Sequence, residues 1–355
     1  MNSKERVLAA AERKRTDRPP TSLYGTPEAM ERLRKYMGVA TDADVMDELD
    51  IDLRWVGAPF IGPQERSTGT LEGEGTDFWG CRYRKAENEF NTYFEFDYHP
   101  LAEALTVDDV ENHDWPSAAW WDYSKLPASI AAQNRVEPRA IIYFAGGAFE
   151  SPWYIRGMEN FLMDLYENPE IVEAICTHVV DFYTERTRRA LAAAQGGIDI
   201  INSGGDIGSQ HTMLLDPDLW RKHIKPFSSR LIAPYKEMGL KTFYHSCGAI
   251  VPVIDDLIEM GLDILDPIQP KAAGMDPENI FAKFGDRLSF HGAIDEQELL
   301  PHATADEVYA ATTHVIDTLG KNGGYIVAPA HAVQGDTPPE NVVAIYKAVQ
   351  DYRWR

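Results

Sequence analysis

The sequence predicts an α/β fold, a single (β/α)8 TIM barrel with a β-hairpin region inserted between its second and third strands. Two observations predict this fold. Short β-rich runs alternate with longer segments of helical period, a pattern typical of a parallel sheet wrapped by helices. The β-rich runs number about eight, the number of strands that closes such a barrel.

Apolar, β-rich character marks each predicted strand. The predicted strands are residues 19–24, 50–56, 140–146, 199–204, 241–246, 263–267, 288–294 and 324–329. Several of the intervening segments open with Asp-Pro, Thr-Pro or Thr-Ala and close near a glycine, as helix capping requires. The predicted helices are residues 27–37, 158–195, 216–239, 250–261, 305–320 and 338–350.

One region, residues 61–125, interrupts the alternation because it is acidic and aromatic. Two runs of strand character flank a polar turn at residues 85–88, which predicts the inserted hairpin. The sequence has no Ser/Gly/Pro linker, solenoid repeat or low-complexity tract. We therefore expect one elaborated domain over residues 1–355.

Composition excludes some classes of partner. Hydrophobic residues make up 44% of the chain and charged residues 25%, which is typical of a globular protein. The 34 Lys and Arg are outnumbered by 56 Asp and Glu, and the formal net charge is −22. A surface of that charge repels phosphate backbones and anionic lipids, so nucleic acid and membrane surfaces are poor candidate partners.

The cysteines and the first residues of the chain indicate a cytoplasmic protein. Cys81, Cys176 and Cys247 are too few and too scattered for a disulfide framework, which points to a reducing compartment. The opening stretch, "MNSKERVLAAAERKRTDRPP", is charged throughout and lacks the apolar run of a secretory signal.

Polar side chains gather where the predicted strands end, which is where the active site of a (β/α) barrel forms. The candidates at these junctions are Ser203, Asp206, His245, Cys247, Asp266, Gln269, His291, His331 and Gln334. Another set follows the third strand in "GGAFESPWYIRGMENFL". There Glu150 and Arg156 are candidates to line a pocket, with a salt bridge as the alternative for them, and Phe149 and Trp153 would supply apolar walls.

The pair His245 and Cys247 suggests a metal site. Residues two apart on a strand project to one side, and the glycine that follows lets the backbone turn tightly. Thiolate and imidazole together suit zinc, but a packed core pair explains His-x-Cys about as well. His331, at the end of the last predicted strand, would be a third ligand and leave a fourth position open.

The stretch "SGGDIGSQ", residues 203–210, is a second candidate. Its glycines permit close approach to a ligand, and Asp206 can bind metal, orient a histidine or take a proton. The alternative is a loop whose aspartate caps a neighbouring helix.

Four stretches of the second half resemble the uroporphyrinogen decarboxylase superfamily. They are "SGGDIGSQHTMLLDPDLWRKHIKP", "HSCGAIVPVIDDLIEMGLDILDPIQPKAAGMDP", "FGDRLSFHGAID" and "GGYIVAPAHAVQGDTPPEN". The similarity runs from "SKERVLAAAERKRTDRPP" to "DTPPENVVAIYKAV" and so covers most of the chain. The resemblance implies a single (β/α) barrel with its pocket at the carboxyl face of the strands.

The superfamily has two branches, and the sequence is closer to the second. True decarboxylases carry an arginine clamp after the first strand and an aspartate after the second, but here these junctions read "LYGTPEAM" and "VGAPFIGP". Cobamide-dependent methyltransferases bind zinc through His-x-Cys and a later ligand that is often cysteine. His245 and Cys247 match the first part, and His331 occupies the later loop.

The resemblance thus implies a zinc-dependent methyltransferase that moves a methyl group between a small substrate and a corrinoid carried by a partner protein. Zinc would lower the pKa of a thiol or polarise a methyl ether, with Asp206 or Glu150 as fourth ligand or proton partner. The rival is a decarboxylase that uses His331, Tyr143 and Asp206 without metal. A third possibility is a corrinoid or tetrapyrrole carrier without catalysis, although polar strand ends favour an enzyme.

Overall fold

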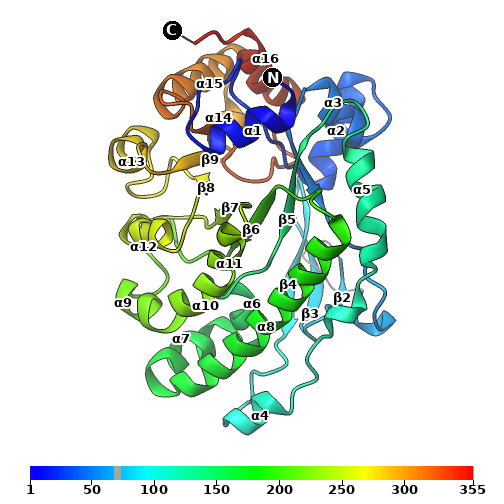
Figure 1. Ribbon diagram of the computed structural model, residues 1–355, viewed down its shortest axis with the longest axis vertical. Helices are drawn as coiled ribbons and strands as arrows, with labels where there is room; N and C mark the ends of the chain where they lie inside the picture. The colour runs from blue at the N-terminus through cyan, green and yellow to red at the C-terminus, as the bar shows by residue number, and fades with distance from the viewer. Residues whose placement is uncertain (68–72, 355) are drawn as a thin grey trace.

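Seven parallel strands form the central sheet of the computed structural model, which describes residues 1–67 and 73–354 (Figure 1). The spatial order is β1-β5-β6-β7-β8-β9-β10, so neighbours in the chain are neighbours in the sheet. The strands are β1 (Leu53–Val56), β5 (Ala140–Phe144), β6 (Ile200–Gly204), β7 (Lys241–His245), β8 (Ile264–Ile268), β9 (Ser289–Ile294) and β10 (Tyr325–Pro329). They confirm seven of the eight predicted strands.

The first predicted strand, residues 19–24, forms isolated bridges instead of a regular strand. Pro19 and Pro20 have no backbone N–H to donate to a ladder, which explains the difference. The segment still joins the two edge strands. Val327 N donates to Pro20 O (2.8 Å) on the β10 side, and Leu53 N donates to Thr21 O (3.1 Å) on the β1 side.

A buried carboxylate, Asp52, anchors this junction. Its side chain is fully buried and accepts hydrogen bonds from Arg6 Nη1 (2.6 Å), Arg18 Nη1 (2.7 Å) and the backbone N of Thr21 (2.9 Å). Helix α1 (Ser3–Ala11), the bridging segment and β1 therefore meet at one ionic cluster.

Helices surround the sheet, and the two termini lie at the same end of the molecule (Figure 1). The remaining helices are α2 (Pro27–Met37), α3 (Asp42–Glu48), α4 (Val107–Glu111), α5 (Leu126–Gln133), α6 (Glu150–Arg156), α7 (Met158–Glu167), α8 (Pro169–Ala194), α9 (Pro217–Leu219), α10 (Lys225–Arg230), α11 (Ala233–Glu237), α12 (Ile254–Glu259), α13 (Pro277–Phe284), α14 (Leu299–His302), α15 (Ala305–Leu319) and α16 (Pro339–Asp351). Short 3-10 turns lie at Gln64–Arg66, Ala118–Trp120, Tyr123–Lys125 and Val251–Val253, and a π-helical turn at Trp220–Ile224.

Two predicted helices are broken in the structure. Residues 158–195 form α7 and α8, because Pro169 cannot continue a helix and starts a new one. Residues 216–239 form α9, the π-helical turn, α10 and α11 in succession. Pro226 and Pro234 lie in the first turns of α10 and α11, where a missing N–H costs nothing.

The region between β1 and β5 contains a small antiparallel sheet of β2 (Gly75–Thr76), β3 (Arg82–Glu87) and β4 (Thr92–Tyr98). Residues 68–72 of the predicted insertion lie outside the described residues. The turn between β3 and β4 contacts α2 and the loop after β10. Asn91 Oδ1 accepts from Gly335 N (3.0 Å), and Glu28 Oε1 accepts from Thr92 N (3.3 Å).

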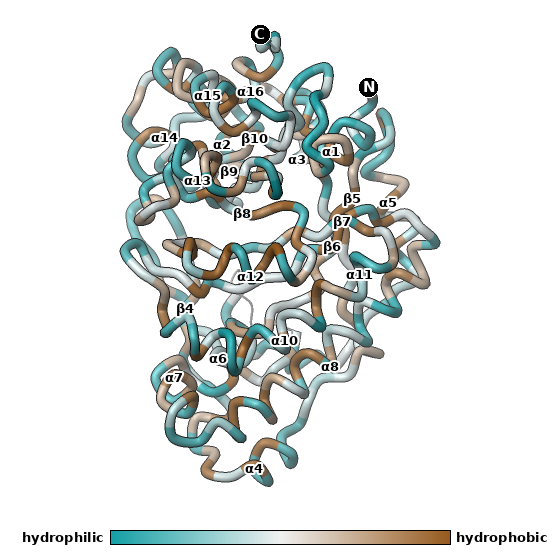
Figure 2. The backbone as a smooth tube through the Cα atoms, turned by 60° about the vertical axis from the view of Figure 1, so that its left-hand side comes forward, coloured by the Kyte–Doolittle hydropathy of each residue, from teal (hydrophilic) through white to brown (hydrophobic). Residues whose placement is uncertain are grey.

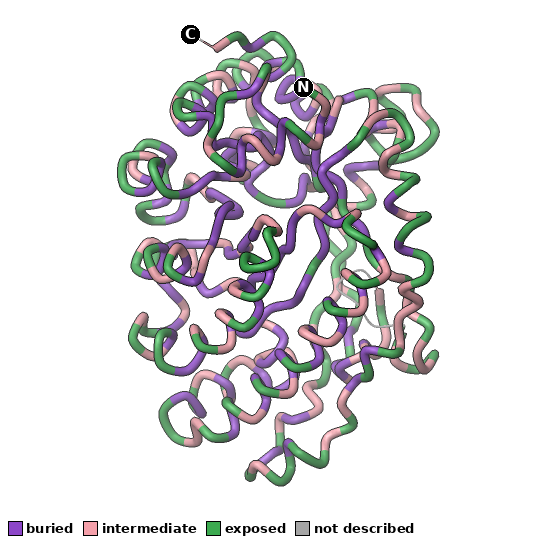
Figure 3. The backbone as a smooth tube through the Cα atoms, in the orientation of Figure 1, coloured by how far each residue is buried: buried purple, intermediate pink, exposed green. Residues whose placement is uncertain are grey.

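The strands are largely hydrophobic in Figure 2 and buried in Figure 3. One core cluster, with Leu53, Ala140, Ile142, Phe243 and Ile326, fills the space inside the curled sheet. Larger clusters lie between the strands and the helices. Across residues 1–67 and 73–354, none of the helices has both the length and the apolar character that crossing a bilayer requires.

We expect Asp52→Asn to lower the free energy of unfolding by about 1–3 kcal/mol, because Arg6 and Arg18 lose their shared, fully buried anion. Urea denaturation measures the change. Asp286→Asn is the control, since Asp286 is exposed and lies 3.7 Å from Arg287. Equal small shifts in the two variants would contradict the structural role of Asp52.

Candidate active site

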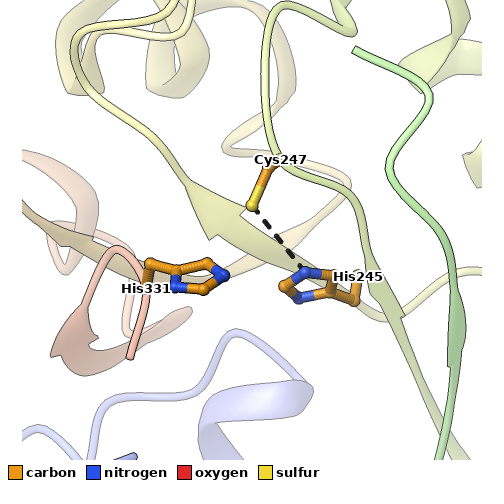
Figure 4. Close-up of side chains that lie close together, drawn as sticks. All are labelled: His245, Cys247 and His331. Carbon is orange, nitrogen blue, oxygen red and sulfur yellow. Dashed lines mark hydrogen bonds between the residues drawn. The ribbon is translucent and has the colours of Figure 1, made fainter. Parts of the chain in front are cut away.

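Three side chains converge at the carboxyl end of the sheet. His245 ends β7, Cys247 follows two residues later, and His331 lies two residues after β10. One ligand atom from each lies within 4.8 Å of the others, and the three side chains point toward one another (Figure 4). Cys247 Sγ is 3.8 Å from His245 Nε2. A thiol and two imidazoles at this spacing fit zinc, as the sequence predicts.

The backbone after Cys247 explains why a glycine stands there. Gly248 has φ +85°, and a Cβ at this position would lie 2.4 Å from the carbonyl carbon of Gly208. The chain therefore turns in a conformation that favours glycine while it packs against the loop after β6. This close approach brings Asp206 to the cysteine.

Asp266 on β8 holds two histidines at once. Its Oδ2 is 2.6 Å from His245 Nδ1, and its Oδ1 is 2.5 Å from His291 Nδ1. Burial raises the pKa of Asp266, but the two histidines outweigh it and hold that pKa well below its usual value. With Nδ1 of His245 taken, Nε2 faces Cys247 and is free to ligate a metal.

Asp206, in the loop after β6, contacts the same pair. Its Oδ1 accepts a hydrogen bond from Cys247 N (2.7 Å) and lies 3.4 Å from His245 Nε2. Burial opposes a negative charge here, yet hydrogen bonding and charge interaction with His245 lower the pKa of Asp206. Burial alone would lower the pKa of His245, but Asp266 and Asp206 outweigh it and raise that pKa well above its usual value.

A metal ion must compete with protons at this site, since Cys247 and His245 both favour the protonated form. Burial raises the pKa of the Cys247 thiol to about 11, so binding of a cation at neutral pH releases the thiol proton. Burial of the ring and the positive charge of His245 lower the pKa of His331, although the residue as a whole is exposed. A neutral imidazole is the form that ligates.

Three residues predicted to contact substrate have protein partners, and a fourth, His291, has one at Nδ1 only. Ser203 Oγ donates to Gly146 O (3.0 Å), and Gln334 Nε2 donates to Ala332 O (2.9 Å). Gln269 Oε1 accepts from Gly248 N (2.8 Å) and so supports the turn after Cys247. His291 Nε2 is buried and has no hydrogen-bond partner among the described residues.

Two residue assignments differ in the structure, and a third stays a prediction. Tyr143, the third, lies in a buried cluster with Leu126 and Ala190. Phe149 is buried in the main core, edge-on to Phe161.

Arg156 forms a buried salt bridge with Asp164 (2.7 Å). The structure therefore shows the salt bridge that was the alternative to a place in the pocket wall.

A cavity of about 330 Å³ lies beside these groups, between β5, β6, α6, α8 and the inserted region. Its lining residues are Asp77, Phe78, Trp79, Tyr83, Phe144, Gly147, Glu150, Ser151, Tyr154, Tyr183, Arg186 and Gly204. Glu150 and Tyr154 are four residues apart on α6 and share a face, whereas Trp153 packs against the main core. Tyr154 OH donates to Glu150 Oε1 (3.0 Å). Burial, followed by the charge of Asp206, raises the pKa of Glu150.

The family model described as "Uroporphyrinogen decarboxylase (URO-D)" matches residues 103–352, which is most of the chain. The chain belongs to the uroporphyrinogen decarboxylase family. The part of the chain that matches the family model begins in the inserted region and includes all three candidate metal ligands.

Both branches of the family are present among the relatives. "Methylcobamide:CoM methyltransferase MtbA" of Methanosarcina mazei is 22% identical over 99% of this chain and 98% of its own length. "Methylated-thiol--coenzyme M methyltransferase" of the same species is 23% identical over 68% of this chain, and the match spans 62% of that enzyme. "Uroporphyrinogen decarboxylase" of Rickettsia bellii is 22% identical over 61% of this chain and 62% of its own length.

A solved structure agrees on the fold of this family member. The structure titled "methyltransferase from Methanosarcina mazei" superposes with a TM-score of 0.67, at 18% identity and over 99% of both chains. The parallel strands and surrounding helices described above therefore match the fold of that structure over 99% of both chains.

Asp266→Asn should weaken zinc binding by about 10- to 100-fold, because the candidate ligand His245 loses its carboxylate partner. Competition with a chromophoric chelator measures the affinity. Asp295→Asn is the matched control, since Asp295 is also buried at this edge and binds the backbone of Gln297 instead. Unchanged affinity in Asp266→Asn, or an equal loss in both variants, would contradict this role.

Asp77 gives a pH-dependent prediction. Burial raises its pKa to about 6, above the value near 3.8 of the unfolded chain. Its contribution to stability is therefore complete below about pH 4 and is lost as the pH rises through 6. Relative to Asp77→Asn, the wild-type free energy of unfolding should fall by about 2–3 kcal/mol between about pH 4 and pH 7. Urea unfolding at both pH values tests this, and a difference that does not vary with pH contradicts it.

Proposed function

We propose that this family member is a zinc-dependent methyltransferase that moves a methyl group between a small substrate and a corrinoid cofactor carried by a partner protein. The observation that supports it is the convergence of His245, Cys247 and His331 at the carboxyl end of the sheet. Three ligands leave one position open, as in catalytic zinc sites. The free thiols Cys81, Cys176 and Cys247 support a place in the reducing cytoplasm.

The bound ion would supply Lewis acidity to a thiol or to a methyl ether oxygen. The chain's own groups have separate roles around it. Asp266 fixes the ring of His245, and Asp206 holds the backbone of Cys247. Glu150, whose pKa is raised, is a proton donor beside them.

In the demethylating direction, a corrinoid in its Co(I) state on the partner protein would supply the electron pair that takes up the methyl carbon. The substrate oxygen would keep the pair of the broken C–O bond and take up one proton, for which Glu150 is our candidate source. With a thiol acceptor the methyl group would pass from the corrinoid to the sulfur, and the thiol proton would go to the same carboxylate.

The relatives support this branch of the family. The name of the M. mazei protein that aligns over 98% of its length specifies methylcobamide and coenzyme M, a corrinoid and a thiol. At 22% identity that likeness leaves the methyl donor and acceptor of this chain open.

The metal-free decarboxylase remains the second candidate, because a relative with that name is equally identical, at 22%. Its proposed site is His331, Tyr143 and Asp206, of which Tyr143 lies in a buried cluster with Leu126 and Ala190. It would release carbon dioxide from a carboxylated pyrrole and be indifferent to chelators.

Zinc analysis of protein purified without added metal tests the methyltransferase proposal. We expect about one zinc per chain in the wild type and a large loss in Cys247→Ala. Cys176→Ala is the control, since Cys176 is buried in the core among apolar residues. Wild-type protein without zinc, or equal zinc in Cys247→Ala, would remove the proposal.

The third ligand needs its own test. We expect His331→Ala to weaken zinc binding and His331→Cys to retain it, because thiolate and imidazole are both zinc ligands. Chelator competition distinguishes the variants. If His331→Ala binds zinc as tightly as the wild type, His331 contacts substrate instead.

A further inference from the structure

Arg186, on α8, is a buried cation without an acidic partner. It is 9% exposed, and its Nη2 donates to Phe144 O (2.9 Å). Its Nε is buried and has no hydrogen-bond partner in the part of the chain that the structure describes. Within the described residues no carboxylate lies at ion-pair distance from it, whereas the buried Arg6 and Arg156 each have one.

Aromatic rings surround this guanidinium. Its Cζ lies 5.0 Å from the ring centroid of Tyr183, 5.4 Å from Trp121, 5.8 Å from Tyr143 and 5.9 Å from Phe182. Cation–π contact offsets part of the cost of burying the charge. It leaves the guanidinium without an anionic partner, which a carboxylate in the plane of the guanidinium would supply.

The same arginine lines the cavity of about 330 Å³. Rings of Phe78, Trp79 and Tyr183 form apolar walls there. The two acids on the wall already have donors. Asp77 accepts from Cys81 N (2.9 Å) and Tyr83 OH (3.1 Å), and Glu150 accepts from Tyr154 OH. Arg186 is thus the polar group of the cavity whose hydrogen-bonding capacity is least used.

The cavity borders the candidate metal site. Gly204 lines it and is the register partner of His245 in the β6–β7 pair. Glu150 lines it too, and the charges of Asp206 and His245 both affect the pKa of Glu150. A Cβ on Gly205 would lie 3.2 Å from Glu150 Cγ. A ligand in the cavity would therefore have one end near the metal ligands.

We infer that the substrate of this site is a small aromatic carboxylate, with its carboxylate on Arg186 and its ring between the aromatic walls. The cavity has the volume of a site for a small ligand. A tetrapyrrole with many carboxylates would need several cations, and this cavity offers one. The binding of an aromatic carboxylate in this cavity does not depend on the function proposed above. The further step, that this molecule carries the transferred methyl group, rests on that function.

Calorimetric titration with three probes tests the inference: benzoate, the neutral isostere benzamide, and acetate. Benzoate should bind, benzamide about 10- to 100-fold more weakly, and acetate not measurably, since the site needs both charge and ring. Arg186→Met should abolish the preference for benzoate over benzamide. Arg186→Lys should keep part of it, because the charge remains. Arg188→Met, on the exposed face of α8, is the matched control and should bind benzoate as the wild type does.

The inference is overturned if the wild type fails to bind benzoate or binds benzamide equally well. These two titrations need no variant, so a misfolded Arg186→Met leaves the test intact. It is also overturned if a folded Arg186→Met, checked by its melting temperature, keeps the preference. Zinc content distinguishes a failure of this inference from a failure of the proposed methyltransferase function. Arg186→Met should contain wild-type zinc, and Cys247→Ala should bind benzoate normally.

Discussion

The proposed metal centre depends on the hydrogen bond between His245 and Asp266. The two residues are register partners in the parallel β7–β8 pair, so the sheet itself places the carboxylate beside the imidazole. A slip of one residue would turn one of the two side chains to the other face of the sheet. Asp266 leaves only Nε2 of His245 available, and that nitrogen faces Cys247.

Charge around the site is balanced by two carboxylates and three histidines. Asp266 binds His245 and His291, while Asp206 contacts His245 from the other side. This arrangement stabilises a positive charge, whether a proton on His245 or a cation between His245, Cys247 and His331. It explains why the buried Asp266 and the half-buried Asp206 lie at this edge, which packing alone does not explain.

The sequence was most informative where burial leaves a clear pattern. Seven predicted strands were confirmed because apolar runs bounded by polar junctions have few other interpretations. The prediction of a regular strand at residues 19–24 was wrong, because two prolines there lack the backbone N–H groups that a strand donates. The role of Tyr143 stays a prediction, because a strand buried on both faces shows no polar alternation from which the inward side can be read.

Other parts of the site carried no usable signal in the sequence. Asp266 was recognised at a strand end, but nothing in "DILDP" indicates that it binds two histidines. Arg186 lies in "TERTRRALA", where three arginines on one helix look alike. Only the packed structure separates the buried Arg186 from the exposed Arg188.

The two halves of the candidate site come from different halves of the chain. The cavity is lined by residues between Asp77 and Gly204, and the metal ligands lie between His245 and His331. Mutations in the inserted region and α8 can therefore reshape the cavity without changing a ligand. Substrate choice can therefore diverge within such a fold while the side chains His245, Cys247 and His331 stay in place.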